Sequence, residues 1–266
     1  MPPSGPRQGD AFGALLLACL DAGVKPGAVF EFIERDDGYL DATDAALYFS
    51  RPEDWSEPER WACDRAFAHC AQSAKGGRIL DVGAGAGRHA LHLQERGAEV
   101  VALDVSPLAG EVCRRRGARR VFTGTVFDLA EHARASGERF DAFLLIGNNL
   151  GLLGGAAHAP TFLSALASLA RPDAVILGAG MDPYATANEL HRGYHARNRT
   201  LGRMGGQIRM RVRHKDLATG WFDYLFTTAD ELRDLVEGTA WRLEQVEQGD
   251  GGPGYVAQLR LKRDEE

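Results

Sequence analysis

Three alternating glycines and an acidic residue stand together in the segment ILDVGAGAGRHA, at residues 79–90. An apolar run leads into Asp81, and Gly83, Gly85 and Gly87 follow at the start of an expected helix. Glycine permits positive φ and lets a ligand touch the backbone, and the first turn of a helix presents free N–H groups to negative charge. The segment therefore predicts a ligand-binding loop between a strand and a helix.

A second acidic residue indicates the kind of ligand. Asp104 ends the next apolar run, 19 residues after Gly85. A carboxylate in that position can accept two hydrogen bonds from a ribose diol. Together with the glycines, Asp104 predicts an adenine nucleoside that lies across the ends of two neighbouring strands.

The glycines alone leave two ligands open. Residues 85–90, GAGRHA, also fit the G-x-G-x-x-A pattern of dinucleotide-binding loops, and Asp104 would suit NAD. Three other features separate the two ligands: an acidic residue that suits an ammonium group, a sheet that would end in a reversed strand, and a helical segment that is unusual for a simple dehydrogenase. Asp81 stands two positions before Gly83, the C-terminus has the pattern of a hairpin, and a long helical pattern precedes the first strand.

The elements that must position these residues alternate from residue 76 onwards. Short apolar runs and helical periodicity follow one another, which is the pattern of βαβ units and a parallel sheet. We expect strands at 78–82, 99–103, 121–123, 140–146 and 174–177, and helices at 88–96, 106–117 and 161–170. Further on we expect a half-exposed strand at 207–213, a capped helix from Thr228, and a hairpin of strands at 241–247 and 255–261.

Length and composition limit the class of protein. The chain has 266 residues, 44% of them hydrophobic and 26% charged, which is ordinary for a large globular domain with an attachment. The net charge of −6 argues against a nucleic-acid binder. The apolar stretch at 11–20 is too short to span a bilayer, and the four cysteines lack CxxC spacing. We expect a cytoplasmic protein with reduced thiols and no membrane partner.

Residues 78–151 resemble the cofactor half of class I S-adenosylmethionine-dependent methyltransferases. The resemblance rests on Asp81-Val-Gly-Ala-Gly-Ala-Gly87, on Asp104, and on the segments TVFDL at 125–129 and FDAFLLIGNNLGLLGG at 140–155. It implies an α/β, Rossmann-like fold with a seven-stranded, mostly parallel sheet, an antiparallel C-terminal strand and helices on both faces. Residues 1–75 would be a loose tail followed by a helical N-terminal cap, and residues 76–266 the methyltransferase domain.

The resemblance also assigns roles in binding S-adenosylmethionine. Asp81 would lie near the amino group of the cofactor, and Asp104 would hold the ribose hydroxyls. The cofactor would touch the backbone of the glycine loop, at Gly83, Gly85 and Gly87. The adenine would lie against Val105, Val126 and Phe127. Many members of the family carry an acidic residue after the third strand, whereas Thr125 and Val126 stand there in this chain, with Asp128 as a substitute or as a helix-capping residue.

The reacting methyl group would lie beyond the fourth strand. Gly147, Asn148 and Asn149 follow that strand, and we expect Asn149 to orient the acceptor, although an asparagine before Gly151 can also form a left-handed turn. His191 and His195 are candidate general bases on one helix face. They lack a third ligand with metal-site spacing, so no metal is expected.

Acceptor-binding candidates come from three segments. Tyr184 follows the fifth strand, and Trp55 belongs to a group of aromatic residues in the cap that includes Tyr39, Tyr48, Phe49 and Trp61. Arg211 and Arg213 lie in a basic stretch, residues 192–215, which contains no Asp or Glu. The two arginines either belong to a solvated strand face or receive an anionic group of the acceptor.

The predicted function is methyl transfer from S-adenosylmethionine to a small-molecule acceptor, with an anionic acceptor as one expectation. The chain lacks an NPPY-type sequence, and this absence argues against nucleic acids and proteins as substrates. Two alternatives remain at this point. One is an NAD(P)-dependent oxidoreductase, and the other is a protein that binds S-adenosylmethionine without turnover.

Overall fold

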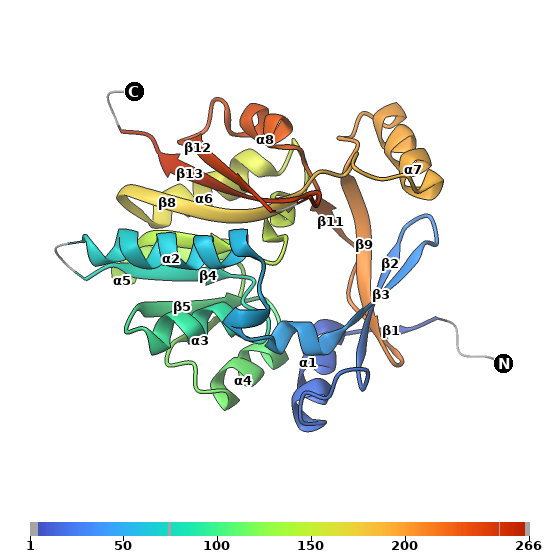
Figure 1. Ribbon diagram of the computed structural model, residues 1–266, viewed down its shortest axis with the longest axis horizontal. Coiled ribbons are helices and arrows are strands. Elements are labelled where there is room, and N and C mark those ends of the chain that lie inside the picture. Colours follow the sequence, from blue (N-terminus) through green and yellow to red (C-terminus); the bar gives the residue numbers. More distant parts are fainter. Residues whose placement is uncertain (1–4, 74–75, 250, 264–266) are drawn as a thin grey trace.

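A seven-stranded sheet between two layers of helices forms the larger part of the computed structural model, which describes residues 5–73, 76–249 and 251–263 (Figure 1). The spatial order is β12-β13-β8-β7-β4-β5-β6, and only β13 runs antiparallel to its neighbours. The strands are β4 (Arg78–Val82), β5 (Glu99–Asp104), β6 (Val121–Thr123), β7 (Phe140–Leu145), β8 (Ala170–Met181), β12 (Trp241–Gln248) and β13 (Gly254–Leu261). The expected α/β fold with a mostly parallel sheet is confirmed. Pro172 lies inside β8, although we expected it between the helix and the strand.

Two hydrophobic clusters fix the helices to the two faces of this sheet. One face carries α2 (Glu57–Ala71), α3 (Arg88–Glu95) and α4 (Pro107–Arg115), and the other carries α5 (Val126–Ser136), α6 (Ala159–Leu169) and α8 (Ala229–Val236). Trp241, Phe140 and Phe143 are fully buried, and burial of each such side chain contributes roughly 1.5–3 kcal/mol. The parallel strands β4, β5 and β7 therefore hold their carboxyl ends at one edge of the sheet.

A second sheet stands beside that edge. Its order is β1-β10-β9-β2-β3, and β11 also pairs with β9. The strands are β1 (Arg7–Gln8), β2 (Phe30–Arg35), β3 (Leu40–Asp44), β9 (Gln207–His214), β10 (Leu217–Ala218) and β11 (Phe222–Leu225). β2 pairs with β9, so the second sheet joins the N-terminal segment to a segment from the last third of the chain.

This sheet corrects part of what we expected of the N-terminal segment. Residues 30–44 form two strands, and Arg7–Gln8 pairs with β10 instead of belonging to a loose tail. The helical part of the expected cap consists of α1 (Ala11–Asp21), two short 3₁₀ helices (Ala45–Phe49 and Pro52–Asp54) and α2. The boundary between residues 75 and 76 stays a prediction, and residues 74 and 75 lie outside the described residues.

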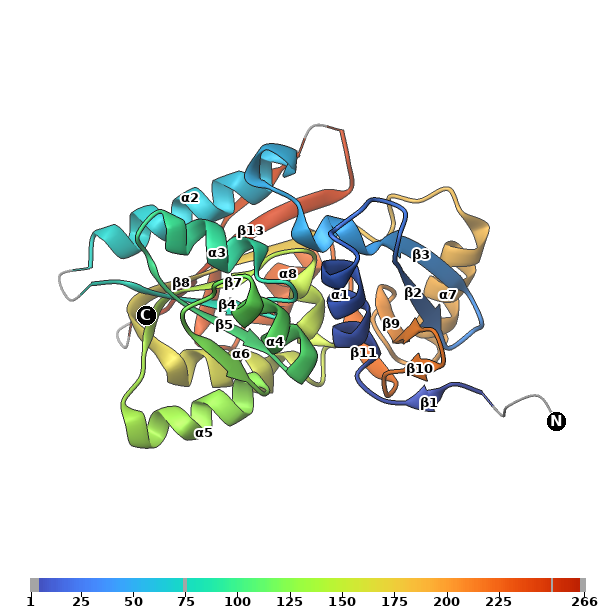
Figure 2. The same ribbon diagram turned by 90° about the horizontal axis from the view of Figure 1, so that it is seen from below.

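Helix α1 lies between the two sheets in both views (Figures 1 and 2). Asp10 caps it, because its Oδ1 accepts a hydrogen bond from the N–H of Gly13 at 2.9 Å. The other oxygen of Asp10 accepts from the Ser106 hydroxyl at 2.8 Å and from the N–H of Leu108 at 3.1 Å. The cap is thus hydrogen-bonded to the first turn of α4, directly after Asp104. Among the described residues, no helix is long and apolar enough to cross a membrane.

Candidate active site

The glycine loop between β4 and α3 adopts the left-handed backbone that its sequence predicts. Gly83, Gly85 and Gly87 have φ of +71°, +56° and +77°. A Cβ at Gly83 would come within 2.6 Å of Asn149 Nδ2, so this glycine permits a close approach inside the protein. The atoms nearest to a Cβ at Gly85 would be those of the Phe12 and Tyr48 rings, at 3.6 and 3.8 Å. Side chains of the cap therefore lie at van der Waals distance from this glycine.

Asp104 joins the end of β5 to this loop. Its Oδ2 accepts from the N–H of Gly85 at 2.8 Å, and its Oδ1 accepts from the N–H of Ser106 at 2.9 Å. Burial raises the pKa of Asp104 to about 6, although the hydrogen bonds from Ser106 and Gly85 act in the opposite direction. Each carboxylate oxygen keeps a lone pair beyond these bonds, so a ribose diol can still donate to it.

Asp81 is a second buried carboxylate at the same edge. Its Oδ2 accepts from the N–H of Ala90 at 3.2 Å, and burial raises its pKa. It makes no ion pair with the residues that the structure describes. A buried carboxylate without an opposite charge is costly, and the ammonium group of a ligand would supply that charge.

Two exposed apolar side chains flank Asp104 at the strand ends. Val105 is 68% exposed and Phe127 is 39% exposed, whereas Val126 is buried in the core. The surroundings of these two side chains fit a flat aromatic base, which would cover apolar surface that now faces solvent. Asp128 belongs to the capping box of α5, where it accepts from the N–H of Thr125 at 2.8 Å. The hydrogen bond from the Thr125 hydroxyl at 2.6 Å, together with this backbone bond, lowers the pKa of Asp128 and favours capping as its role.

The asparagines after β7 tie this strand to the glycine loop. Asn149 Nδ2 donates to the carbonyls of Val82 and Gly83, both at 3.0 Å. Asn148 has a left-handed φ of +66°, as does Gly147 at +73°, and its carbonyl accepts from the Tyr224 hydroxyl at 2.7 Å. The amide of Asn149 is therefore occupied within the protein, and this arrangement favours a positioning role over the catalytic one that we expected.

The comparisons with known proteins agree with this geometry. Residues 79–173 match a family model described as a methyltransferase domain. The structure is similar to that of an S-adenosylmethionine-dependent methyltransferase from Bacteroides fragilis in complex with S-adenosyl-L-homocysteine. The TM-score is 0.76, the identity is 27%, and the similarity covers 96% of this chain and 95% of that chain. The protein is an S-adenosylmethionine-dependent methyltransferase with a class I fold.

Two further structures share the fold of this methyltransferase. The 1,6-didemethyltoxoflavin-N1-methyltransferase of Burkholderia thailandensis is 21% identical, with a TM-score of 0.52 over 78% of this chain and 80% of that chain. The amino pentose methyltransferase CalS10 of Micromonospora echinaspora is 19% identical, with a TM-score of 0.51 over 82% and 95%. The family match decides between the two ligands that the glycines left open, in favour of the methyl donor.

Near the glycine loop lies a polar cluster that the sequence did not reveal as a unit. The Tyr48 hydroxyl donates to Glu31 Oε2 at 2.8 Å, and the ring of Tyr48 lies beside Gly85. Glu31 is only 4% exposed, and burial raises its pKa. Burial and the charge of Glu31 raise the pKa of both Tyr48 and Tyr224, and the Tyr224 hydroxyl donates to the carbonyl of Asn148. We name these three residues the acceptor cluster.

Arg88 lies at the border of the same space, at the start of α3. Its Nη1 donates to the Ser50 hydroxyl at 2.6 Å, its Nη2 pairs with Glu59 at 2.7 Å, and Nη2 lies 3.9 Å from a Cβ built at Gly147. It therefore links the cap to the end of β7. Tyr48 was among the aromatic residues that we expected in the cap. The other members of the acceptor cluster stand alone in the sequence, without a motif around them.

The remaining candidate residues lie away from the glycine loop. Trp55 is buried, donates from Nε1 to the Ser50 carbonyl at 3.3 Å, and packs against His89, which makes it a core residue between α2 and α3. His195 lies on α7 (Glu189–Thr200), where its ring contacts Tyr184 edge to face at 5.5 Å. The Tyr184 hydroxyl donates to Glu231 of α8. The structure does not bring these side chains to Gly85.

The other candidate base and the two arginines are also placed elsewhere. His191 packs against the ring of Tyr39 at the β2–β3 turn, and its Nε2 is buried without a hydrogen-bond partner among the described residues. Arg211 and Arg213 both pair with Glu34, at 2.8 and 3.3 Å. Met210 and Val212 alternate with them and are buried, Val212 against α1, so the arginines point away from the cofactor domain. This position does not favour the expected contact with an anionic acceptor.

Proposed function

We propose that this methyltransferase acts on a small molecule that is enclosed between the glycine loop and the second sheet. The observation that carries the proposal is the acceptor cluster, in which Tyr48 lies beside Gly85 and donates to Glu31, and Tyr224 donates to the carbonyl of Asn148 after β7. Its residues come from β2, from the 3₁₀ helix Ala45–Phe49 and from β11, so the cap and the second sheet cover the edge where the donor would bind. A polymeric acceptor would need an open path to that edge.

The roles that we propose for the donor site follow from the geometry above. Asp81 receives the ammonium group of S-adenosylmethionine, and Asp104 receives the ribose hydroxyls. Val105 and Phe127 hold the adenine between them, and the N–H of Val126 in the first turn of α5 is free to contact it. The sulfonium methyl group would then face the end of β7 at Gly147 and Asn148, with the acceptor cluster on its other side.

In the acceptor cluster, we assign to Glu31 the role of a general base for the nucleophilic atom of the acceptor. Methyl transfer is an in-line displacement, so the acceptor atom must be held about 3–3.5 Å from the methyl carbon and aligned with the bond that breaks. Burial makes the Glu31 carboxylate a stronger base, and Tyr48 holds it by a hydrogen bond. The Glu31 carboxylate suits an amine or hydroxyl acceptor, because it can accept the proton that the acceptor loses as its new bond to the methyl carbon forms.

Related folds are compatible with this acceptor class. By their names, the Burkholderia protein acts on 1,6-didemethyltoxoflavin and CalS10 acts on an amino pentose. Both are small molecules. Since these proteins share only the fold with this chain, the acceptor cluster and not the likeness carries the proposal. We also retain the prediction that the protein acts in the cytoplasm, with its four buried, free cysteines reduced.

The proposal is tested by a screen for S-adenosyl-L-homocysteine formation, in which pooled amines and hydroxy compounds compete against tRNA and a peptide library. We expect turnover with a small molecule. Glu31→Gln should then lower kcat about 100-fold, because the variant cannot accept a proton, while the Kd of S-adenosyl-L-homocysteine stays within about twofold. Turnover with tRNA or peptides alone would overturn the small-molecule assignment.

Glu34→Gln is the matched control. Glu34 lies on the same strand as Glu31 but on the opposite face, where it pairs with Arg211 and Arg213. We expect this variant to keep its kcat. An equal loss of kcat in the two variants would mean that β2 acts only as scaffold, and Glu31 would have no role at the reacting atom.

A further inference from the structure

Glu31, the proposed general base, has one carboxylate oxygen that the protein leaves open. The side chain is only 4% exposed, and its Oε2 accepts from the Tyr48 hydroxyl at 2.8 Å. Its other oxygen, Oε1, has no hydrogen-bond partner among the described residues, although it keeps contact with solvent. A nearly buried acceptor atom without a partner is costly, so Oε1 indicates a ligand that donates to it.

The charges around Glu31 favour a positively charged ligand. Glu31 lies opposite Thr43 in the pairing of β2 with β3, and Asp41 lies on the same face, two residues along β3. Burial raises the pKa of Glu31, the hydrogen bond from Tyr48 lowers it, and the charge of Asp41 raises it again. No ion pair of Glu31 involves a residue that the structure describes. A carboxylate in this position is costly without an opposite charge.

Two arginines of the surrounding elements have carboxylate partners of their own. Arg35 follows on the same face of β2 and binds both oxygens of Asp37, at 2.7 Å each. Arg88 at the start of α3 pairs with Glu59 at 2.7 Å. Neither arginine pairs with Glu31, so a cationic ligand would supply the charge that these side chains do not.

Aromatic rings from three elements meet at the acceptor cluster. Tyr48 donates to Glu31, and its ring contacts that of Phe12 of α1 edge to face at 5.3 Å. The ring of Tyr224 contacts that of Phe222 on the same face of β11 at 6.4 Å. All four rings keep part of their surface exposed. The faces of such rings attract cations, most strongly where water is excluded.

We propose that the acceptor is a small aliphatic amine that binds at the acceptor cluster as an ammonium ion. Its charge would lie opposite Glu31 Oε1 and against the rings of Tyr48 and Tyr224. This inference rests on the proposed function and narrows its acceptor class. A hydroxyl compound could donate to Oε1, but it would leave the charge of Glu31 without a partner.

The reaction keeps this balance of charge. The bound ammonium ion loses one proton through Glu31 to solvent, and the lone pair of its nitrogen then forms the bond to the methyl carbon. The carbon–sulfur bond breaks with its electron pair on sulfur, which leaves neutral S-adenosyl-L-homocysteine. The positive charge thus passes from sulfur to nitrogen, beside Glu31, and the product leaves as a methylated ammonium ion.

Calorimetric titration with choline and with 3,3-dimethylbutan-1-ol tests the preference for a cation. The two probes have the same shape, and only choline carries a positive charge. Saturating S-adenosyl-L-homocysteine fills the donor site, so that choline cannot bind at Asp81. We expect saturable binding of choline and at least tenfold weaker binding of the alcohol. Equal affinities, or no saturable binding of choline, would overturn the proposal.

Variants then locate the bound cation. Glu31→Gln should raise the Kd of choline at least tenfold, whereas Glu34→Gln on the opposite face of β2 should leave it unchanged. Tyr224→Phe and Tyr224→Leu both remove the hydroxyl, and only the second removes the ring, so only the second should weaken choline binding severalfold. Affinity for S-adenosyl-L-homocysteine shows that a variant is folded, and if Glu31→Gln fails this check, the two Tyr224 variants decide. Equal Kd values in all folded variants would contradict the site.

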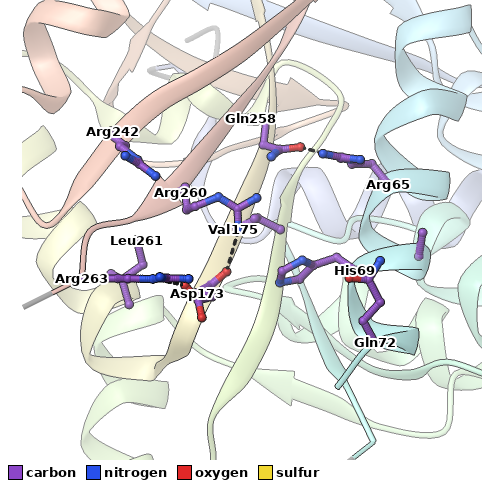
Figure 3. Close-up of a pocket in the computed structure, with 11 residues that line it drawn as sticks. Arg65, His69, Gln72, Asp173, Val175, Arg242, Gln258, Arg260, Leu261 and Arg263 are labelled. Carbon is purple, nitrogen blue, oxygen red and sulfur yellow. Dashed lines mark hydrogen bonds and ion pairs between the residues drawn. The ribbon is translucent and has the colours of Figure 1, made fainter. Parts of the chain in front are cut away.

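A cavity of about 510 Å³ elsewhere in the molecule provides the control for location (Figure 3). It lies toward the amino end of β8, beside α2 and β13, whereas the glycine loop follows the carboxyl end of β4. No Phe, Tyr or Trp is among the described residues that line it, and Asp173 is its acidic side chain. Asp173→Asn should leave the Kd of choline unchanged. A rise as large as in Glu31→Gln would place the cation in this cavity and contradict the acceptor cluster.

A screen with matched pairs separates this inference from the proposed function. Each primary amine is paired with the alcohol of the same skeleton, and formation of S-adenosyl-L-homocysteine is measured with both pools and with tRNA. We expect turnover of amines. Turnover of the alcohols at equal or higher rates would overturn the inference and leave a small-molecule acceptor standing, whereas turnover of tRNA alone would overturn both. Without turnover in any pool, the choline titration decides.

Discussion

At the scale of single residues, the proposed contact of Asp104 with the ribose predicts how donor binding depends on pH. Burial raises its pKa to about 6, and only the ionised carboxylate can accept both hydroxyls of a ribose. We therefore expect the affinity for S-adenosyl-L-homocysteine to be full above about pH 7 and to fall as the pH drops through 6. Well below 6 the fall should approach tenfold per pH unit. Calorimetric titration between pH 5 and 8 measures it.

The Asp104→Asn variant is the control for this dependence. It cannot titrate at this position, so its weaker affinity should lose the part of the pH dependence that belongs to Asp104 and keep only a part that Asp81 contributes. The stability of the free protein should change in the opposite direction. Because the folded-state pKa lies above the unfolded value, the protonated form favours folding, and this contribution is lost as the pH rises through about 6. A wild-type affinity that does not change between pH 5 and 8 would remove Asp104 from the ribose site.

At the scale of elements, the close contact of α1 with α4 depends on the absence of a side chain at Gly13. A Cβ there would lie 2.2 Å from the Ser106 hydroxyl and 2.6 Å from Leu108 Cβ. We expect Gly13→Ala to lower the free energy of unfolding by about 2 kcal/mol, because overpacking forces the helices apart. The Kd for S-adenosyl-L-homocysteine should rise, since Ser106 donates its N–H to Asp104. Denaturant unfolding and calorimetry measure the two effects.

Gly193→Ala provides the comparison. Gly193 is also a helical glycine, in α7, but a Cβ there meets nothing within 4 Å. This exchange should stabilise the protein by up to about 1 kcal/mol, as expected for alanine in an open helix position. A loss of stability in Gly193→Ala as large as in Gly13→Ala would show that helix glycines matter here for a reason other than the packing of α1.

The elements also explain which parts of the protein were predictable. Strands β4 to β8 and helices α3, α4 and α6 follow one another along the chain, and Ser106 before Pro107 is a local cap, so the sequence indicates each of these elements where it stands. The second sheet depends on the pairing of β2 with β9, and no local pattern shows that contact. Residues 30–44 therefore seemed to continue a helical segment.

The same distinction applies to the site. The donor residues share one motif and the next strand end, and the sequence predicts them together. The acceptor cluster brings together Glu31, Tyr48 and Tyr224, which become neighbours only when the second sheet forms. For Arg211 and Arg213, the sequence shows only that they alternate with apolar residues. Their partner Glu34 and the direction in which they point follow from the register with β2.

At the scale of the whole molecule, the cap forms one wall of the proposed donor site, and donor binding should stabilise it. Phe12 of α1 and Tyr48 lie beside Gly85, and Asp10 is bonded to the start of α4. A donor that binds beside Gly85 would therefore contact residues of the cap, which are far from the glycine loop in the sequence. We expect S-adenosyl-L-homocysteine to slow amide exchange in α1 and in residues 45–50, in addition to residues 79–90.

Helix α8 is the internal reference for this experiment. It packs against α6 and β12 on the other face of the sheet, so its exchange should change only as far as global stability changes. Protection confined to residues 79–128 would contradict the prediction, because the cap would then be a separate layer over a complete donor site. Protection of α1 together with the glycine loop would instead mean that the bound donor orders the cap. The surface that we propose for the acceptor would then be complete only with the donor in place, so that the acceptor would bind after the donor.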